Sequence, residues 1–342
     1  MPTTGLATAL RRLAHGEALS AGEARAAFDV VMRGEASVAQ TAGLLLGLRV
    51  KGETPDEVAG AAGALRAAMV LVRADRPEEL VDTCGTGGGS VPTFNISTAS
   101  ALLAAGAGVR VAKHGNRSFT SRSGSADVLE ALGVPIDAPV ETLERALREA
   151  GIVFMYAPAM HPAMRHVGPV RRELGVPTVM NVVGPLANPA RAGRQVVGVA
   201  EASRLPLIAG ALAALGTVRA LVVHGEPGMD EISPLGPTRV VEVLEGRLRE
   251  WSIDPADHGV TGGSADALAG GDPADNARII GAVLDGSGEP VARDAVVLNA
   301  AAALYVAGAA PSYGAAVAIA RAALAAGVGR TALERLRRAY AR

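Results

Sequence analysis

Residues 80–98 read LVDTCGTGGGSVPTFNIST. The first four predict a short buried strand, and the segment NIST at the end predicts a helix start. Four of the five residues from Gly85 to Gly89 are glycines. A strand, a glycine loop and a helix start together place backbone N–H groups and a positive dipole end where an anion can bind. The stretch therefore predicts a phosphate-binding loop, of neither the dinucleotide nor the Walker type, with a flexible turn capped by Ser97 or Thr98 as the alternative.

Short β-branched runs alternate with helical segments along the middle of the chain. The predicted strands are 80–83, 109–112, 152–155, 195–199 and 218–223, and the predicted helices are 97–107, 125–132, 141–150 and 203–215. This alternation is typical of an α/β fold with a mostly parallel central sheet. Ligands of such folds bind at the carboxyl ends of the strands. Residues 158–189 lack the alternation, and after Asp272 the chain is again predicted to be helical.

The first 72 residues predict four packed helices. Three segments, 20–23, 37–40 and 54–57, fit the capping-box pattern, and Gly16, Gly34 and Gly52 lie where helices should end. We therefore expect a helical domain over residues 1–74, joined by a returning segment within 160–190. Residues 75–342 are expected to form the α/β domain.

Composition excludes several classes of protein. The net charge of the 342 residues is -1, and nine scattered aromatic residues offer no stacking platform for nucleic acid. A single cysteine, Cys84, excludes an intrachain disulfide and suits a reducing compartment, so we expect a cytoplasmic protein. No signal-peptide pattern is evident, and no strongly apolar run reaches the ~18–20 residues of a membrane span.

Two more segments carry polar groups to the same predicted sheet edge. Residues 112–127 read AKHGNRSFTSRSGSAD, in which Ser125 is expected to cap the next helix. The pair Asp230-Glu231 follows another predicted strand. Paired carboxylates beside phosphate loops suit Mg²⁺, which usually bridges to substrate phosphate, although an acidic pair is by itself more often a solvated surface feature.

In order and spacing, these motifs resemble those of anthranilate phosphoribosyltransferases. The match includes the glycine loop, the segments 95–98, 113–117 and 124–127, residues 161–164 with Arg171, residues 181–186, and Asp230-Glu231. The resemblance covers almost the whole chain. It implies transfer of a phosphoribosyl group from phosphoribosyl diphosphate (PRPP) to the amine of anthranilate in tryptophan synthesis. It also implies Mg²⁺ dependence and a homodimer formed through the helical domain.

The resemblance also implies a role for each matching residue. Lys113, Asn116 and Arg171 are the expected catalytic residues. The residues expected around PRPP are Gly85, Gly88, Gly89, Thr93, Asn95, Ile96, Ser97, Thr98, Lys113, His114, Gly115, Asn116, Arg117, Ser118, Phe119, Thr120, Ser121 and Ser125. Those expected at anthranilate are Gly85, His114, Asn116, His161, Arg171 and Pro185, and those expected at Mg²⁺ are Ser97, Asp230 and Glu231.

Three features of the sequence depart from the pattern of this family. The family normally has aspartate at Gly89 and often glycine at Ser90, and the pair Phe119-Thr120 is also atypical. A glycine at position 89 should leave the binding loop for diphosphate more positive than an aspartate would.

Only Lys51 and Lys113 are lysines among the 33 Lys and Arg residues, and Lys113 lies between the two phosphate loops as a compact point charge. Lys51, near a predicted helix end, is expected to complement the helix dipole.

The sequence is also compatible with two other functions. One is a related phosphoribosyltransferase or nucleoside phosphorylase acting on another acceptor, which would leave Arg171 without a carboxylate to bind. The other is a nucleic-acid-binding relative without catalysis. The near-neutral charge and the retained Asp230-Glu231 pair disfavour it.

Overall fold

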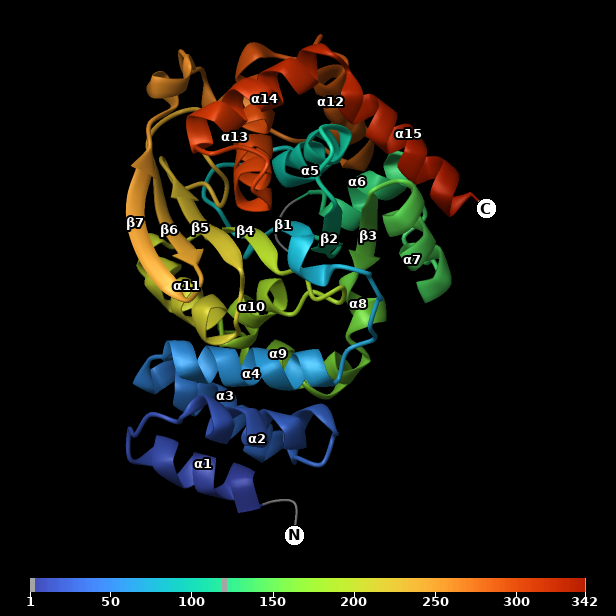
Figure 1. Ribbon diagram of the computed structural model, residues 1–342. Coiled ribbons are helices and arrows are strands. Elements are labelled where there is room, and N and C mark those ends of the chain that lie inside the picture. Colours follow the sequence, from blue (N-terminus) through green and yellow to red (C-terminus); the bar gives the residue numbers. More distant parts are fainter. Residues whose placement is uncertain (1–3, 119–121, 342) are drawn as a thin grey trace.

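The helical bundle lies at one end of the molecule. The computed structural model describes residues 4–118 and 122–341 (Figure 1). The helices between residues 4 and 67 are α1 Thr4–Ala14, α2 Ala21–Met32, α3 Val38–Lys51 and α4 Pro55–Ala67. All three capping boxes form, because Ser20, Ser37 and Thr54 each accept the backbone N–H three residues on. The four predicted helices are therefore confirmed.

A single sheet forms the centre of the rest of the chain. In the described residues its order is β3-β2-β1-β4-β5-β6-β7. The strands are β1 Val81–Gly85, β2 Val111–Gly115, β3 Ile152–Tyr156, β4 Arg194–Gly198, β5 Arg219–Gly225, β6 Thr238–Leu244 and β7 Arg247–Ile253. The first five run parallel, so the predicted α/β fold with a mostly parallel sheet is confirmed.

The antiparallel hairpin of β6 and β7 was not predicted. Its signal is the pair Glu245-Gly246, whose φ angles of 49° and 77° lie in the left-handed region that a two-residue hairpin turn requires. Flanking residues 238–244 and 247–253 carry the β-branched and alternating pattern of two strands.

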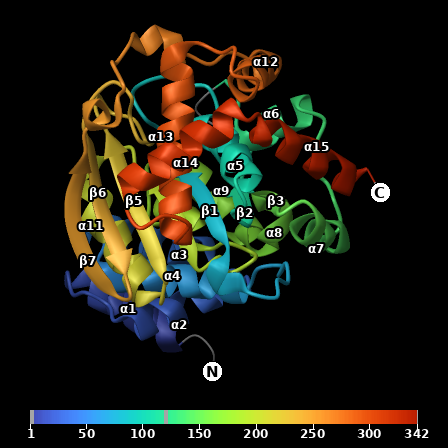
Figure 2. The ribbon, with the colours of Figure 1, turned by 45° about the horizontal axis from the view of Figure 1, so that its top comes forward.

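Helices cover both faces of the sheet (Figure 2). Alternate residues of β5 divide between two cores: Leu221 and Val223 face one, and Ala220 and Val222 face the other. The helices of the first core include α5 Ile96–Gly106, α6 Ser125–Ala131, α7 Val140–Glu149, α12 Pro273–Leu284, α13 Pro290–Ala307, α14 Tyr313–Ala325 and α15 Val328–Tyr340. The second core joins α11 Leu205–Ala214 to the helical bundle.

Helix α13 is long and apolar enough to cross a membrane, but 78% of it is buried inside the molecule. It packs against the sheet and against α5 and α14. We therefore interpret it as a core helix.

The segment between β3 and β4 returns to the helical bundle. It consists of α8 Ala157–Met160, η2 Pro162–His166, α9 Gly168–Leu174, α10 Met180–Val183 and η3 Gly184–Leu186. Its α9 contacts α3 and its α10 contacts α4. Backbone hydrogen bonds from Val70 to Met160 (2.8 Å) and from Val72 to Pro189 (3.1 Å) bring the two connections between bundle and sheet side by side.

Candidate active site

The loop between β5 and β6 crosses the carboxyl ends of β1 and β4. A Cβ atom on Gly198 would lie 1.7 Å from the carbonyl oxygen of Asp230, and one on Gly225 would lie 2.5 Å from that of Glu231. No side chain fits at either position, so these two glycines let the acidic pair lie directly on the sheet edge. Neither was predicted from the sequence, because their role appears only when the loop is in place.

The glycine loop lies against Asp230. Cβ atoms on Gly85 and Gly89 would lie 3.1 Å and 2.8 Å from its carboxylate oxygens. Gly87 and Gly88 have φ angles of 69° and 86°, which only glycine adopts freely. Among the described residues, no group accepts a hydrogen bond from the N–H of Gly88 or Gly89. The loop therefore has backbone donors available for an anion, and its binding of phosphate stays a prediction.

Helix α5 begins at Ile96, one residue before the predicted start, with Asn95 as its N-cap residue. The alternative interpretation, a turn capped by Ser97 or Thr98, is therefore wrong. The backbone N–H of Ser97 donates to the Glu231 carboxylate at 3.1 Å. A carboxylate thus already occupies the positive end of this helix. The Ile96 side chain is fully buried in the core, so the expected contact of this residue with PRPP could come only from its backbone and stays a prediction.

Asn95 and Thr98 also face protein groups. The Asn95 amide donates to the carbonyl of Ser123 at 3.1 Å, and its oxygen accepts from the Asn276 amide at 2.8 Å. Asn95 thereby joins the α5 start to the loop after β2 and to α12. Thr98 is 1% exposed, and its hydroxyl has no partner among the described residues. Thr93 lies half-buried just before them.

Lys113, on β2, is buried beneath the loops. Its ammonium donates to the carbonyl of Thr83 and to the hydroxyl of Ser97, 3.2 Å away. Burial lowers the pKa of Lys113, and the nearby charge of Asp82 opposes this shift. The ammonium therefore lies behind Ser97 and adds positive charge to the site, and its contact with diphosphate stays a prediction.

Asp82 and Asn188 form a buried polar network beside Lys113 that the sequence did not reveal. The Asp82 carboxylate accepts from the backbone N–H of His114 (3.1 Å) and from the Asn188 amide (2.8 Å). Burial raises the pKa of Asp82 to about 6, against the opposing effects of Lys113 and these hydrogen bonds. The network fixes the end of β2 relative to β1. Only the position of Asp82 before the glycine loop could have suggested it.

Burial opposes the ionisation of both residues of the acidic pair. Burial, and then the charge of Asp230, raise the pKa of Glu231 to about 8. Burial also raises the pKa of Asp230. Two adjacent carboxylates that are costly to ionise suit a divalent cation, because the cation stabilises the charged form of both.

The loop after β2 folds back on itself. The Ser125 hydroxyl donates to the carbonyl of Asn116 at 3.3 Å. A Cβ on Gly115 would lie 2.2 Å from that hydroxyl oxygen, so Gly115 is required for this approach. Ser125 was predicted to cap α6, but the N-cap residue is Gly124, because the Asp127 carboxylate accepts the Gly124 N–H at 2.9 Å.

Arg117 and Ser118 also engage Asp127. The Arg117 guanidinium pairs with Asp127 at 2.6 Å and Glu130 at 2.7 Å, and the Ser118 N–H donates to Asp127. The predicted contact of Arg117 with PRPP would require it to leave these carboxylates. Three further predicted residues, Phe119, Thr120 and Ser121, lie outside the described residues.

Four of the residues expected at anthranilate, His114, His161, Arg171 and Pro185, lie on the returning segment or against it. His114, on β2, and His161, after α8, are both buried, and their Nε2 atoms lie 3.2 Å apart. Burial lowers the pKa of His161 to about 4 and that of His114 well below its usual value, so both rings are neutral. The carbonyl of Pro185 accepts a hydrogen bond from the Gln195 amide at 2.8 Å.

Arg171, on α9, is loosely held by comparison. Its guanidinium donates to the Asn181 side chain at 3.3 Å, and in the described part of the chain no carboxylate pairs with it. Burial lowers its pKa. A partly buried cation without an anionic partner can bind a substrate carboxylate.

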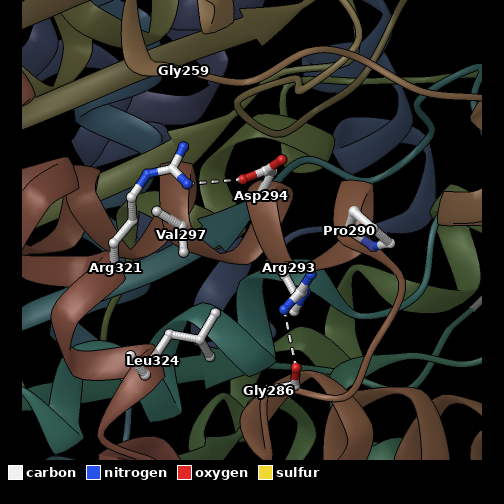
Figure 3. Close-up of a pocket in the computed structure, with 9 residues that line it drawn as sticks. Gly259, Gly286, Pro290, Arg293, Asp294, Val297, Arg321 and Leu324 are labelled. Carbon is white, nitrogen blue, oxygen red and sulfur yellow. Dashed lines mark hydrogen bonds and ion pairs between the residues drawn. The ribbon is translucent and has the colours of Figure 1, made fainter.

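A cavity of about 500 Å³ lies elsewhere, at the start of α13 (Figure 3). Arg321 pairs there with Asp294 at 3.4 Å, and Arg293 donates to the carbonyl of Gly286. Neither the glycine loop nor the acidic pair lines it. The chemistry of the site therefore belongs to the sheet edge and not to this cavity.

Comparison with known proteins identifies two matching family models. The glycosyl transferase family helical bundle domain matches residues 7–69, and the glycosyl transferase family a/b domain matches residues 77–330. The anthranilate phosphoribosyltransferase of Rubrobacter xylanophilus is 53% identical over 330 residues, which are 96% of each chain.

Two solved structures are similar over nearly the whole chain. Anthranilate phosphoribosyltransferase from Thermus thermophilus has a TM-score of 0.92 and 45% identity, covering 98% of this chain and 99% of that one. The enzyme from Saccharomyces cerevisiae in complex with PRPP and Mg has a TM-score of 0.88 and 26% identity, covering 98% of each chain.

Proposed function

The chain belongs to the anthranilate phosphoribosyltransferase family, and from that premise we propose how its residues perform the transfer of a phosphoribosyl group from PRPP to anthranilate. The proposal rests on one observation above all. The loop bearing Asp230 and Glu231 lies on the glycine loop, and Glu231 accepts the Ser97 N–H at 3.1 Å. Phosphate donors and metal ligands therefore lie at one sheet edge.

The diphosphate end of PRPP is assigned to the glycine loop. The free N–H groups of Gly88 and Gly89 are available for its oxygens, and the ammonium of Lys113 lies nearby, against Thr83 and Ser97. The loop from His114 to Ser118 is assigned to the rest of PRPP. Donors aimed at a leaving group stabilise the charge that develops on it.

Mg²⁺ is assigned to Ser97, Asp230 and Glu231, in line with the Saccharomyces cerevisiae structure that contains PRPP and Mg. In the described residues, no group of three or more His, Cys, Asp or Glu side chains could hold a metal by itself. Mg²⁺ characteristically binds through one or two carboxylates together with substrate phosphates. The ion, when bound, would neutralise charge on the departing diphosphate.

Anthranilate is assigned to the joint, where Arg171 would bind its carboxylate. Asn116 would orient its ring, and His114, His161 and Pro185 would line its access path. An aromatic amine is neutral at pH 7, so no strong general base is needed and proximity to ribose C1 supplies much of the acceleration. The neutral state of His114 and His161 agrees with this assignment.

Because the two substrates are assigned to different parts of the molecule, we expect the bundle to close on the α/β domain. The connections near residues 73–80 and around 158–190 would absorb the motion. Small-angle scattering should give a smaller radius with PRPP, Mg²⁺ and an unreactive anthranilate analogue than without them. Superimposable profiles would contradict closure.

The helical bundle is proposed to form a homodimer. Val38, Leu46 and Val50 of α3 are 61%, 36% and 85% exposed, and their spacing by multiples of four places them on one helix face. Light scattering should give twice the chain mass for the wild type and a lower mass for Val50→Asp. A monomeric wild type would refute the dimer. We also propose a cytoplasmic location, which suits the free thiol of Cys84.

The activity is tested by the loss of anthranilate fluorescence in the presence of PRPP and Mg²⁺. We expect rapid decay with anthranilate and slow turnover of aniline, which lacks the carboxylate for Arg171. No decay would overturn the assignment. Equal turnover of aniline would favour the rival function, transfer to another acceptor.

A further inference from the structure

We propose that Asn299 of α13 is the positioning residue that holds the acidic pair in its metal-binding arrangement. This inference rests on the proposed role of Asp230 and Glu231 as Mg²⁺ ligands. Asn299 is 3% exposed. Its side-chain oxygen accepts from the backbone N–H of Ile232 at 2.9 Å, and its amide donates to the carbonyl of the same residue at 2.8 Å.

A two-point contact of this kind fixes both the position and the rotation of a peptide segment. Ile232 directly follows Glu231, so the contact determines where the acidic pair projects. The Asn299 amide also donates to the carbonyl of Ala295 at 2.9 Å, which orients the side chain on its own helix. All of its hydrogen-bonding groups are therefore engaged, as a buried amide requires.

The same turn of α13 holds the other metal-binding segment. The carbonyl of Val296 accepts from the hydroxyl of Ser100, on α5, at 3.2 Å. Ser100 lies one turn beyond Ser97. This turn of α13 thus anchors both the loop that carries the two carboxylates and the helix that carries the serine, and the Ser97 to Glu231 hydrogen bond closes the arrangement.

An amide suits this role better than a carboxylate. Burial already raises the pKa of both acidic residues, and a third buried carboxylate would oppose their ionisation further. Asparagine holds the loop without adding charge. Partners that orient metal ligands in this way typically contribute a factor of about 10–100 to metal affinity.

The test compares Asn299→Leu, which removes every hydrogen bond at similar volume, with the wild-type enzyme. The apparent Mg²⁺ affinity during turnover should fall about 10-fold, with the KM for anthranilate unchanged. In metal-free enzyme the Ile232 amide should exchange its hydrogen faster. Asn299→Ser retains part of the polar contact and should give intermediate values, and it decides the question if the leucine variant does not fold.

The matched control is Val306→Ala, a change at a fully buried position of the same helix. It should lower thermal stability while leaving the Mg²⁺ dependence and the Ile232 exchange as in the wild type. Unchanged Mg²⁺ affinity and exchange in both Asn299 variants, or the same changes in Val306→Ala, would overturn the inference. An unaltered Mg²⁺ dependence in Glu231→Gln would instead refute the metal site itself.

Discussion

The sheet edge and the domain joint hold their polar groups in different ways. At the sheet edge, Lys113, Glu231 and Asp82 each have fixed partners that are part of the protein. At the joint, Arg171 has one hydrogen bond of 3.3 Å, and no carboxylate of the described chain pairs with it. The first region is preorganised, whereas the second has an unsatisfied cation.

This difference follows from the topology of the sheet and from the proposed closure of the two domains. Parallel strands bring several loops to one edge, so a single domain completes the diphosphate and metal region. The acceptor region combines β2 with the returning segment, and only domain closure would complete it. A site that two substrates must enter gains from remaining open until both are bound.

The largest expected effect is at the sheet edge, where the polar groups have fixed partners. Lys113→Arg should lower kcat/KM about 100-fold, because a guanidinium is larger and a packed site that holds an ammonium between Thr83 and Ser97 does not accommodate it.

The control for this prediction is Lys51→Arg. Lys51 pairs with the buried carboxylate of Glu57 at 2.9 Å in the helical bundle, outside the proposed substrate and metal sites. Its contact is more specific than the helix-dipole partner predicted from the sequence. Steady-state kinetics should show less than about a 2-fold change for this variant. Equal losses of kcat/KM in the two variants would show that position 113 does not require a lysine more than position 51 does.

The next effect concerns the loosely held region. Arg171→Gln should raise the KM for anthranilate about 10- to 100-fold, the scale of one charge-assisted contact, and leave the KM for PRPP unchanged. Its neighbour Arg172 is exposed and provides the control, since Arg172→Gln should change neither constant. A rise in the KM for PRPP with Arg171→Gln would show that the two regions are not separate.

The smallest effect concerns Gly89. A Cβ there would lie 2.8 Å from the Asp230 carboxylate, so Gly89→Asp must displace Asp230 and adds a negative charge beside it. We expect Mg²⁺ titrations of activity to shift about 2- to 5-fold, with the variant depending more strongly on excess Mg²⁺. Coinciding titrations would show that the departure from the family pattern is neutral.

Local patterns predicted the elements of the fold well. The capping boxes at Ser20, Ser37 and Thr54 specify helix starts by contacts within four residues. The hairpin of β6 and β7, which was not predicted, also depends on a local feature, the two-residue turn Glu245-Gly246. Motif spacing likewise indicated the family and the residues of the loops.

Contacts between distant segments could not be predicted. The hydrogen bond from the Ser97 N–H to Glu231 joins segments that are far apart in sequence. The hydrogen bond from the Ile232 N–H to Asn299 does the same. Gly198 is required only because another loop crosses it. The predicted cap at Ser125 was wrong because the Asp127 carboxylate accepts the N–H of Gly124, which is the N-cap residue.

The acidic pair at the sheet edge is proposed to bind Mg²⁺ together with diphosphate. Calorimetry of Mg²⁺ binding in the presence of diphosphate, in buffers of different ionisation enthalpy, measures the protons released. The pKa of Glu231 is raised to about 8, so this carboxyl is protonated below pH 8 without metal and must lose its proton to bind Mg²⁺.

At pH 7 the wild type should therefore release more protons than Glu231→Gln, and its Mg²⁺ affinity should rise with pH and level off above about pH 8. The variant should bind Mg²⁺ more weakly, and its affinity should depend less on pH than that of the wild type. Equal proton release and equal affinity in the two proteins would contradict the account.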